Sequence, residues 1–94
     1  MNTFILWLTI MNVLFWEASM IKLFGGVEKG KGFDVFVDTN KGNHLKYSID
    51  DGPEDYVGLI YNYHTEHEKI TFYEPTTGKI YSWREAVKYV RRLV

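Results

Sequence analysis

The feature that most constrains the fold is an apolar run over residues 4–24, FILWLTIMNVLFWEASMIKLF, in which only Glu17 and Lys22 carry charge. A helix drawn through it is apolar on nearly every side, and such a helix is buried either in protein or in lipid. A membrane span needs about 20 predominantly apolar residues, and Glu17 interrupts this run. We therefore expect a core helix over Phe4–Phe24. A membrane or interfacial helix and an oligomer interface are the alternatives.

Length and composition limit the classes of protein to consider. A chain of 94 residues with no cysteine is expected to form a single domain over residues 1–94, without disulfides or thiolate metal ligands. The first three residues include no basic side chain, and Glu17-Ala18-Ser19 is a poor cleavage site, so we expect a cytoplasmic protein without a secretory signal. The net charge is -1, so a partner attracted by charge would need a local patch.

Glycine dominates the segment that follows the apolar run. Residues 25–32, GGVEKGKG, contain four glycines. This composition predicts the end of a helix and a flexible loop. Lys29 and Lys31 lie among the glycines, but their order does not match a phosphate-binding P-loop, and no such site is predicted.

Alternating apolar and polar residues predict two β-hairpins in the middle of the chain. Residues 33–39 and 44–50 have the period of half-buried strands and flank the turn at residues 40–43. Residues 56–64, YVGLIYNYH, and residues 70–74, ITFYE, predict the second hairpin. Both faces of residues 56–64 carry apolar groups, which is typical of a central strand.

Two polar turns contain residue types that bind metal ions. Residues 50–55, DDGPED, hold four carboxylates, but not at the spacing of a calcium-binding loop. Residues 64–68, HTEHE, place His64 and His67 three apart, whereas the metalloprotease helix needs two histidines four apart. We predict no metal site and no cofactor. No nucleophile paired with a base is evident either, so we predict that the protein is not an enzyme.

The C-terminal segment predicts a short strand at Ile80-Tyr81 and then an amphipathic helix. Ser82 and Glu85 have the spacing of a capping box, with Ser82 as the N-cap. Apolar residues recur at helical spacing along one side of residues 83–94, and basic residues occupy much of the remainder. Together with the lysine of the preceding turn, they form a candidate nucleic-acid site of Lys79, Arg84, Lys88, Arg91 and Arg92.

A local resemblance covers about a fifth of the chain. Residues 72–90, FYEPTTGKIYSWREAVKYV, resemble the hairpin and helix of methyl-CpG-binding domains, and to a lesser degree the plant AP2-type domain. The resemblance implies a short hairpin leading directly into a capped helix. In the methyl-CpG family a guanine-reading arginine stands between the aromatic residue of the short strand and the capping serine. Here Tyr81 is followed directly by Ser82, so that arginine has no counterpart.

The segments together predict an α+β fold. It comprises an N-terminal apolar helix, an antiparallel sheet of four strands with Ile80-Tyr81 as a candidate fifth, and a C-terminal amphipathic helix, with both helices on one sheet face. The leading hypothesis for function is a small non-catalytic binding module, of protein-interaction or inhibitor type, that uses an aromatic sheet face to bind a protein partner or a second copy of the chain. The candidate interface residues are Tyr56, Ile60, Asn62, His64, Thr71 and Tyr73.

Two other classes of function stay open. One is a nucleic-acid-binding domain that uses the C-terminal hairpin and the basic helix, with lysine and arginine contacting phosphates. The other is a small membrane-associated protein held through residues 4–24, which the interrupted apolar run makes the less favoured alternative.

Overall fold

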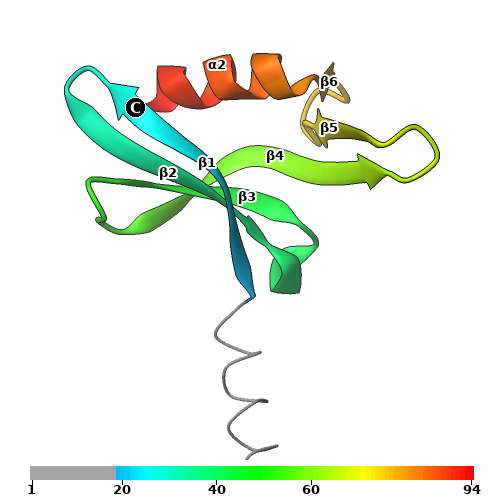
Figure 1. Ribbon diagram of the computed structural model, residues 1–94, viewed down its shortest axis with the longest axis horizontal. Helices are drawn as coiled ribbons and strands as arrows, with labels where there is room; N and C mark the ends of the chain where they lie inside the picture. Colours follow the sequence, from blue (N-terminus) through cyan, green and yellow to red (C-terminus); the bar gives the residue numbers. More distant parts are fainter. Residues whose placement is uncertain (1–18) are drawn as a thin grey trace, which may run out of the picture.

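The computed structural model describes residues 19–94, and within them the chain forms one antiparallel sheet and a C-terminal helix (Figure 1). The six strands lie in the sheet in sequence order, each bonded to the next. The elements are β1 (Met20–Glu28), β2 (Lys31–Asp38), the short 3-10 helix η1 (Thr39–Lys41), β3 (His44–Ile49), β4 (Glu54–His64), β5 (Lys69–Tyr73), β6 (Ile80–Tyr81) and α2 (Trp83–Leu93). The sheet curls beneath α2 as a half-barrel (Figure 1).

Short turns join successive strands, and this explains the simple strand order. β1 and β2 pair up to Glu28 and Lys31, so the turn has two residues, Lys29 and Gly30, both with positive φ. That geometry matches the twist of a hairpin. η1 lies between β2 and β3, where the Asp38 carboxylate accepts a hydrogen bond from the backbone N–H of Asn40 at 3.1 Å. Antiparallel neighbours of this kind need no long crossover.

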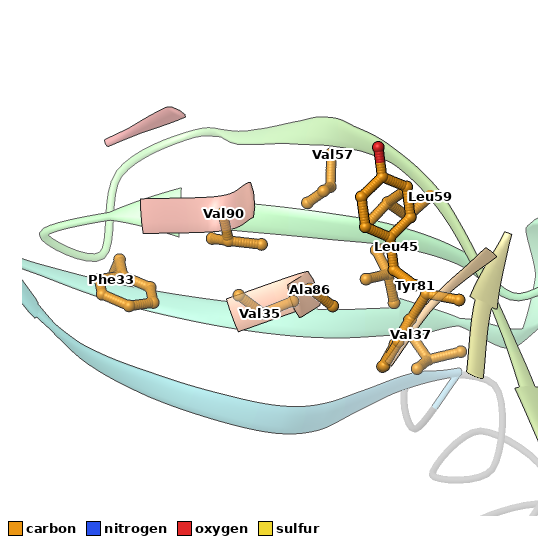
Figure 2. Close-up of a cluster of buried hydrophobic side chains, with 10 residues drawn as sticks. Phe33, Val35, Val37, Leu45, Val57, Leu59, Tyr81, Ala86 and Val90 are labelled. Carbon is orange, nitrogen blue, oxygen red and sulfur yellow. The ribbon is translucent and has the colours of Figure 1, made fainter. Parts of the chain in front are cut away.

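The core lies between the inner, concave face of the sheet and α2. Alternate residues of β2 point inward, and Val35 in the middle of that strand is fully buried. Ala86 and Val90 from α2 meet this face and are fully buried as well (Figure 2). The buried apolar residues are Phe33, Val35, Val37, Leu45, Val57, Leu59, Phe72, Tyr81, Ala86 and Val90.

Aromatic rings close the end of the core near the N-terminus of α2. The Trp83 ring lies 5.5 Å from that of Phe24 in β1 and 5.8 Å from that of Phe72 in β5, measured between centroids. Ser82 caps the helix as predicted: its side chain accepts a hydrogen bond from the Glu85 N–H, and the Glu85 carboxylate accepts one from the Ser82 N–H. The cap therefore places Trp83 between β1, at one edge of the sheet, and β5, next to the other edge.

The expected N-terminal helix is wrong where it reaches the described residues. Met20 to Phe24, the last part of the predicted helix over Phe4–Phe24, belong to β1 and pair with β2. Backbone pairing with β2, and packing of Phe24 on Trp83, favour a strand here, and two consecutive glycines after Phe24 disfavour a helix. Residues 4–18 of the prediction lie outside the described residues.

The predicted sheet and helix layers also need correction. The sheet has six strands rather than four or five, because β1 joins one edge and Ile80-Tyr81 pairs with β5 at the other. The fold is mostly antiparallel sheet, and within residues 19–94 the inner face is covered by α2 alone rather than by two helices. Residues 25–32, predicted as a loop, form the turn end of the β1–β2 hairpin. The two central hairpins and the capped C-terminal helix are confirmed.

Candidate functional site

The outer face of the sheet, opposite α2, contains all six residues predicted as a protein interface. Ile60 of β4 pairs with Tyr73 of β5, and Asn62 pairs with Thr71. Since side chains alternate along each strand, residues of this set point away from the buried Leu59 and Phe72. We use the name outer patch for these six residues with Ile80: Tyr56, Ile60, Asn62, His64, Thr71, Tyr73 and Ile80.

An apolar row crosses the middle of the outer patch. The register places Ile60, Tyr73 and Ile80 side by side on β4, β5 and β6. The Ile80 side chain is 63% exposed and Tyr73 is 38% exposed, although both lie in regular pairing. Cross-strand neighbours on one face lie about 4.5–5.5 Å apart, so the three side chains form one continuous apolar strip.

Tyr56 forms the β3 side of the outer patch. Its ring is 50% exposed and stands edge-on to the imidazole of His44, with 6.0 Å between the centroids. The Lys46 ammonium lies 5.0 Å from the centre of the Tyr56 ring and 3.1 Å from a carboxylate oxygen of Asp38. The hydrogen bond from Lys46 lowers the pKa of Asp38, and the same bond raises the pKa of Lys46. Contacts with His44 and Lys46 therefore hold the Tyr56 ring in place.

Polar groups form the other end of the outer patch. The Nε2 atom of His64 and the Oγ1 atom of Thr71 lie 2.7 Å apart in a hydrogen bond. A hydroxyl beside an imidazole is part of a nucleophile and base pair, but catalysis also needs a group that orients the base. Within residues 19–94 no carboxylate is hydrogen-bonded to His64.

Two hollows flank the apolar row. One, of about 360 Å³, is lined by the polar end of the outer patch with His67, Lys69 and Ile80. The other, of about 500 Å³, lies between Tyr56 and the turn after β5, and its lining also includes His44 and Gly58. Both are partly open to solvent, so side chains of a second molecule can enter them.

Sequence reasoning omitted three of the residues that surround this surface. Ile80 was placed in a short strand, and its outward direction follows from the alternation with the buried Tyr81. His44 could have been placed in the same way from the buried Leu45. Pro75, which lines the larger hollow, had no such signal, because it comes near β4 only through the bend after β5.

A carboxylate fixes the bend after β5 to the helix. Glu74 accepts hydrogen bonds from the hydroxyls of Thr77 at 2.7 Å, Tyr81 at 3.0 Å and Tyr89 at 3.0 Å. These bonds, that from Thr77 first, lower the pKa of Glu74. Burial and then the bond to Glu74 raise the pKa values of Tyr81 and Tyr89. The network holds one wall of the larger hollow in place.

The five predicted nucleic-acid contacts do not form one cluster. Lys88, Arg91 and Arg92 line a hollow at the end of α2, together with Lys29 of the β1–β2 turn. The Lys79 ammonium lies instead over the Tyr81 ring, 4.7 Å from its centre, beyond the other end of the helix. Arg84 is exposed in the first turn of α2. Lys29 was not predicted as a contact, because the order of lysines and glycines around it does not match a phosphate-binding P-loop.

The described residues include neither a group that could hold a metal ion nor a helix that could span a membrane. Among residues 19–94, no three histidine, aspartate or glutamate side chains are grouped so that they could hold one metal ion. In the same range, α2 is the sole α-helix, and it is too short and too polar to cross a membrane. Comparison of the chain with protein-family models, curated proteins and solved structures finds no significant match.

Proposed function

We propose that the protein is a non-catalytic binding module that holds a protein partner on the outer patch. The observation that carries the proposal is the apolar row of Ile60, Tyr73 and Ile80, which lies in regular strand pairing, with Tyr73 and Ile80 exposed and Ile60 half-buried beside them. Tyrosine at the centre of such a surface supplies a large contact area at low conformational cost, which is why it is frequent among the residues that dominate binding energy.

The surroundings of the row support a protein as the ligand. Apolar residues at the centre and polar residues such as Asn62, His64 and Thr71 at one side reproduce the core and rim of a protein interface. The two flanking hollows provide recesses for side chains of the partner. The surface is also rigid, because it is built on paired strands, and little ordering would be required on binding.

Site-specific photo-crosslinking tests the proposal. A photoreactive phenylalanine analogue replaces Tyr56 or Tyr73 in the full chain, expressed in its native cells. The matched control replaces Tyr63, which lies on the same strand as Tyr56, is 52% exposed and has the opposite side-chain direction. We expect a discrete protein adduct from positions 56 and 73 and none from position 63. Equal labelling from all three positions, or from none, would contradict the proposal.

The adduct then defines the partner, and its mass separates two cases. An adduct of twice the mass of the chain identifies a second copy, and any other mass identifies a different protein. With the purified partner, Tyr73→Ala should weaken binding by about thirtyfold or more, which corresponds to an interface residue worth about 2 kcal/mol. Tyr63→Ala should leave the affinity within about twofold of the parent.

A further inference from the structure

Charge is unevenly distributed between α2 and the rest of the protein. α2 carries four basic residues and one acidic residue, and it contains all three arginines of the chain. The remaining residues carry seven basic and eleven acidic side chains, a net charge of -4 against +3 on the helix. The overall charge of -1 therefore conceals a cationic helix on an otherwise acidic molecule.

The exposed side of α2 presents its cations in a line. Arg84, Lys88 and Arg92 follow one another at steps of four residues, so they lie along one side of the helix, and all three are exposed. We call these three the cationic row. It extends over about 12 Å at 1.5 Å per residue. Within residues 19–94, none of the ion pairs includes a member of the cationic row.

The end of the cationic row is shaped by a fixed arginine. Arg91 donates a hydrogen bond to the Glu28 carboxylate at 2.9 Å and lies over the Phe33 ring, 5.6 Å from its centre. Glu28 is the one acidic residue that lines the hollow of about 490 Å³ at this end, and Arg91 already neutralises it. Lys29, Lys88 and Arg92 face the same hollow. This end of the helix therefore offers several cations to an anion.

We infer that the cationic row and Lys29 form a second binding surface, which contacts the phosphate backbone of a nucleic-acid duplex without reading its sequence. Arginine and lysine on a rigid helix suit successive phosphates, since guanidinium forms paired hydrogen bonds to phosphate oxygens and lysine adds a point charge. Binding of this kind is driven by counterion release. The acidic remainder of the protein repels the duplex and so orients it towards α2.

Single-stranded nucleic acid fits this surface less well than a duplex. Single strands are bound by aromatic rings on which their bases stack. The aromatic residues of α2 serve the fold instead: Trp83 packs against Phe24 and Phe72, and the Tyr89 hydroxyl is bonded to Glu74. The cationic row therefore offers charge without a stacking platform.

An anionic membrane also fits poorly. A helix that lies on a bilayer inserts its apolar face among the lipids. The middle of the apolar face of α2 is buried against the sheet, where Ala86 and Val90 have no exposed surface, whereas Trp83 and Leu93 at its two ends are partly exposed. Figure 1 shows α2 over the inner face of the sheet, whereas the side chains of the outer patch point away from the buried face, so both surfaces can be occupied at once.

Fluorescence anisotropy with a labelled duplex of random sequence tests the inference. The full-length protein is titrated between about 50 mM and 200 mM salt. We expect the logarithm of the association constant to fall with the logarithm of salt concentration at a slope of about -3 to -4, for four contacting cations. Lys88→Ala with Arg92→Ala should make this slope shallower by about 2.

A matched control keeps the charge change constant. Lys41→Ala with Lys69→Ala also removes two exposed positive charges, but both of these lysines line the hollows beside the outer patch. For this control, the logarithm of the association constant for the duplex should fall with the logarithm of salt concentration at the same slope as for the parent. Thermal melts confirm that both double variants are folded. A parent that fails to bind at low salt, or a control that loses as much affinity as the α2 variant, would overturn the inference.

Two further ligands separate nucleic acid from other polyanions. Phosphatidylserine vesicles and polyglutamate are titrated at the same salt concentration and matched for charge. Weaker binding of both supports a nucleic-acid surface. Equal or tighter binding of either one overturns it, because the surface would then recognise charge or lipid rather than a phosphate backbone.

Discussion

The hydroxyl of Tyr89, in the middle of α2, donates a hydrogen bond of 3.0 Å to the carboxylate of Glu74, which directly follows β5. Tyr81 and Thr77 donate to the other oxygen of the same carboxylate. One ionised side chain therefore connects the helix, the last strand and the bend between β5 and β6. The bend forms one wall of the larger hollow beside the outer patch, so its position determines the shape of that hollow.

Glu74→Gln should reduce the sensitivity of the protein to acid. The pKa of Glu74 is lowered from its ordinary value of 4.5, chiefly by the hydroxyl of Thr77 and then by that of Tyr81. A lowered folded-state pKa means that the carboxylate stabilises the fold fully above the ordinary pKa and that this stabilisation is lost as pH falls through the folded-state pKa. Compared with the parent, the variant should melt lower at pH 7, and the two should converge towards pH 3.

Thermal melts from pH 7 to pH 3 measure this effect. Glu66→Gln, in the exposed β4–β5 turn, is the control and should follow the parent at every pH. A Glu74→Gln protein with the same melting temperature as the parent across this range would show that the three hydrogen bonds do not depend on ionisation.

Ser82→Ala should destabilise the protein by about 1 kcal/mol, because it removes the acceptor for the Glu85 N–H at the start of α2. Ser82→Gly should cost only a few tenths of a kcal/mol, since a glycine N-cap leaves that N–H open to water. Urea unfolding of the three proteins measures both differences. An alanine variant more stable than the glycine variant would indicate that helix propensity, and not the cap, dominates at this position.

The capped helix and the central hairpins could be predicted from sequence because their signals are local. The capping box spans four residues, and the turn at residues 40–43 lies between two alternating segments. The same alternation placed the outer-patch residues on one face, since the direction of a side chain in a strand depends only on its position. Register added what the sequence could not give, namely that Ile80 continues the row of Ile60 and Tyr73.

The first strand was missed because its glycines are required by contacts with the neighbouring strand, and local sequence does not reveal those contacts. Gly25 was interpreted as a helix terminator, yet it lies within β1 opposite Asp34. A Cβ atom there would lie 2.7 Å from the Asp34 carboxylate and 2.8 Å from the Phe33 carbonyl oxygen, so only glycine fits. These neighbours come from β2, and no pattern within the apolar run or the glycine segment indicates them.

Gly58→Ala should destabilise the protein by more than about 1 kcal/mol, through the backbone rather than through a clash. Gly58 has a φ of 96°, and the nearest atom to an added Cβ would be the Tyr89 hydroxyl at an acceptable 3.6 Å. It lies where the β3–β4 register shifts, between the pairs His44 with Ile60 and Lys46 with Tyr56. The positive φ therefore helps to set the direction of Tyr56.

Urea unfolding, together with photo-crosslinking from position 56, tests this role of Gly58. Gly58→Ala should lower both the free energy of unfolding and the yield of the adduct at position 56. Gly58→Asn, with a side chain better suited to positive φ, should cost less than alanine. An alanine variant as stable as the parent would mean that the bulge tolerates a rearranged backbone.

Phe72 and Tyr73 are adjacent on β5 and should separate stability from binding. Phe72 is fully buried, with its ring 5.8 Å from that of Trp83, whereas Tyr73 is 38% exposed in the outer patch. Phe72→Ala should reduce the free energy of unfolding by about 3–5 kcal/mol, since it removes a buried aromatic ring and leaves a cavity. Tyr73→Ala should reduce it by less than about 1 kcal/mol, the value of cross-strand pairs on an exposed face.

The two substitutions should have the opposite order of effect on partner binding. Tyr73→Ala removes the centre of the apolar row while the fold persists, so the crosslinked adduct at position 56 should be lost from a protein that melts almost like the parent. Phe72→Leu keeps the core filled in part and should retain the adduct at temperatures where the variant is folded. If Tyr73→Ala retained the adduct in full, the outer patch would not be the interface, because no other exposed side chain occupies the centre of that row in residues 19–94.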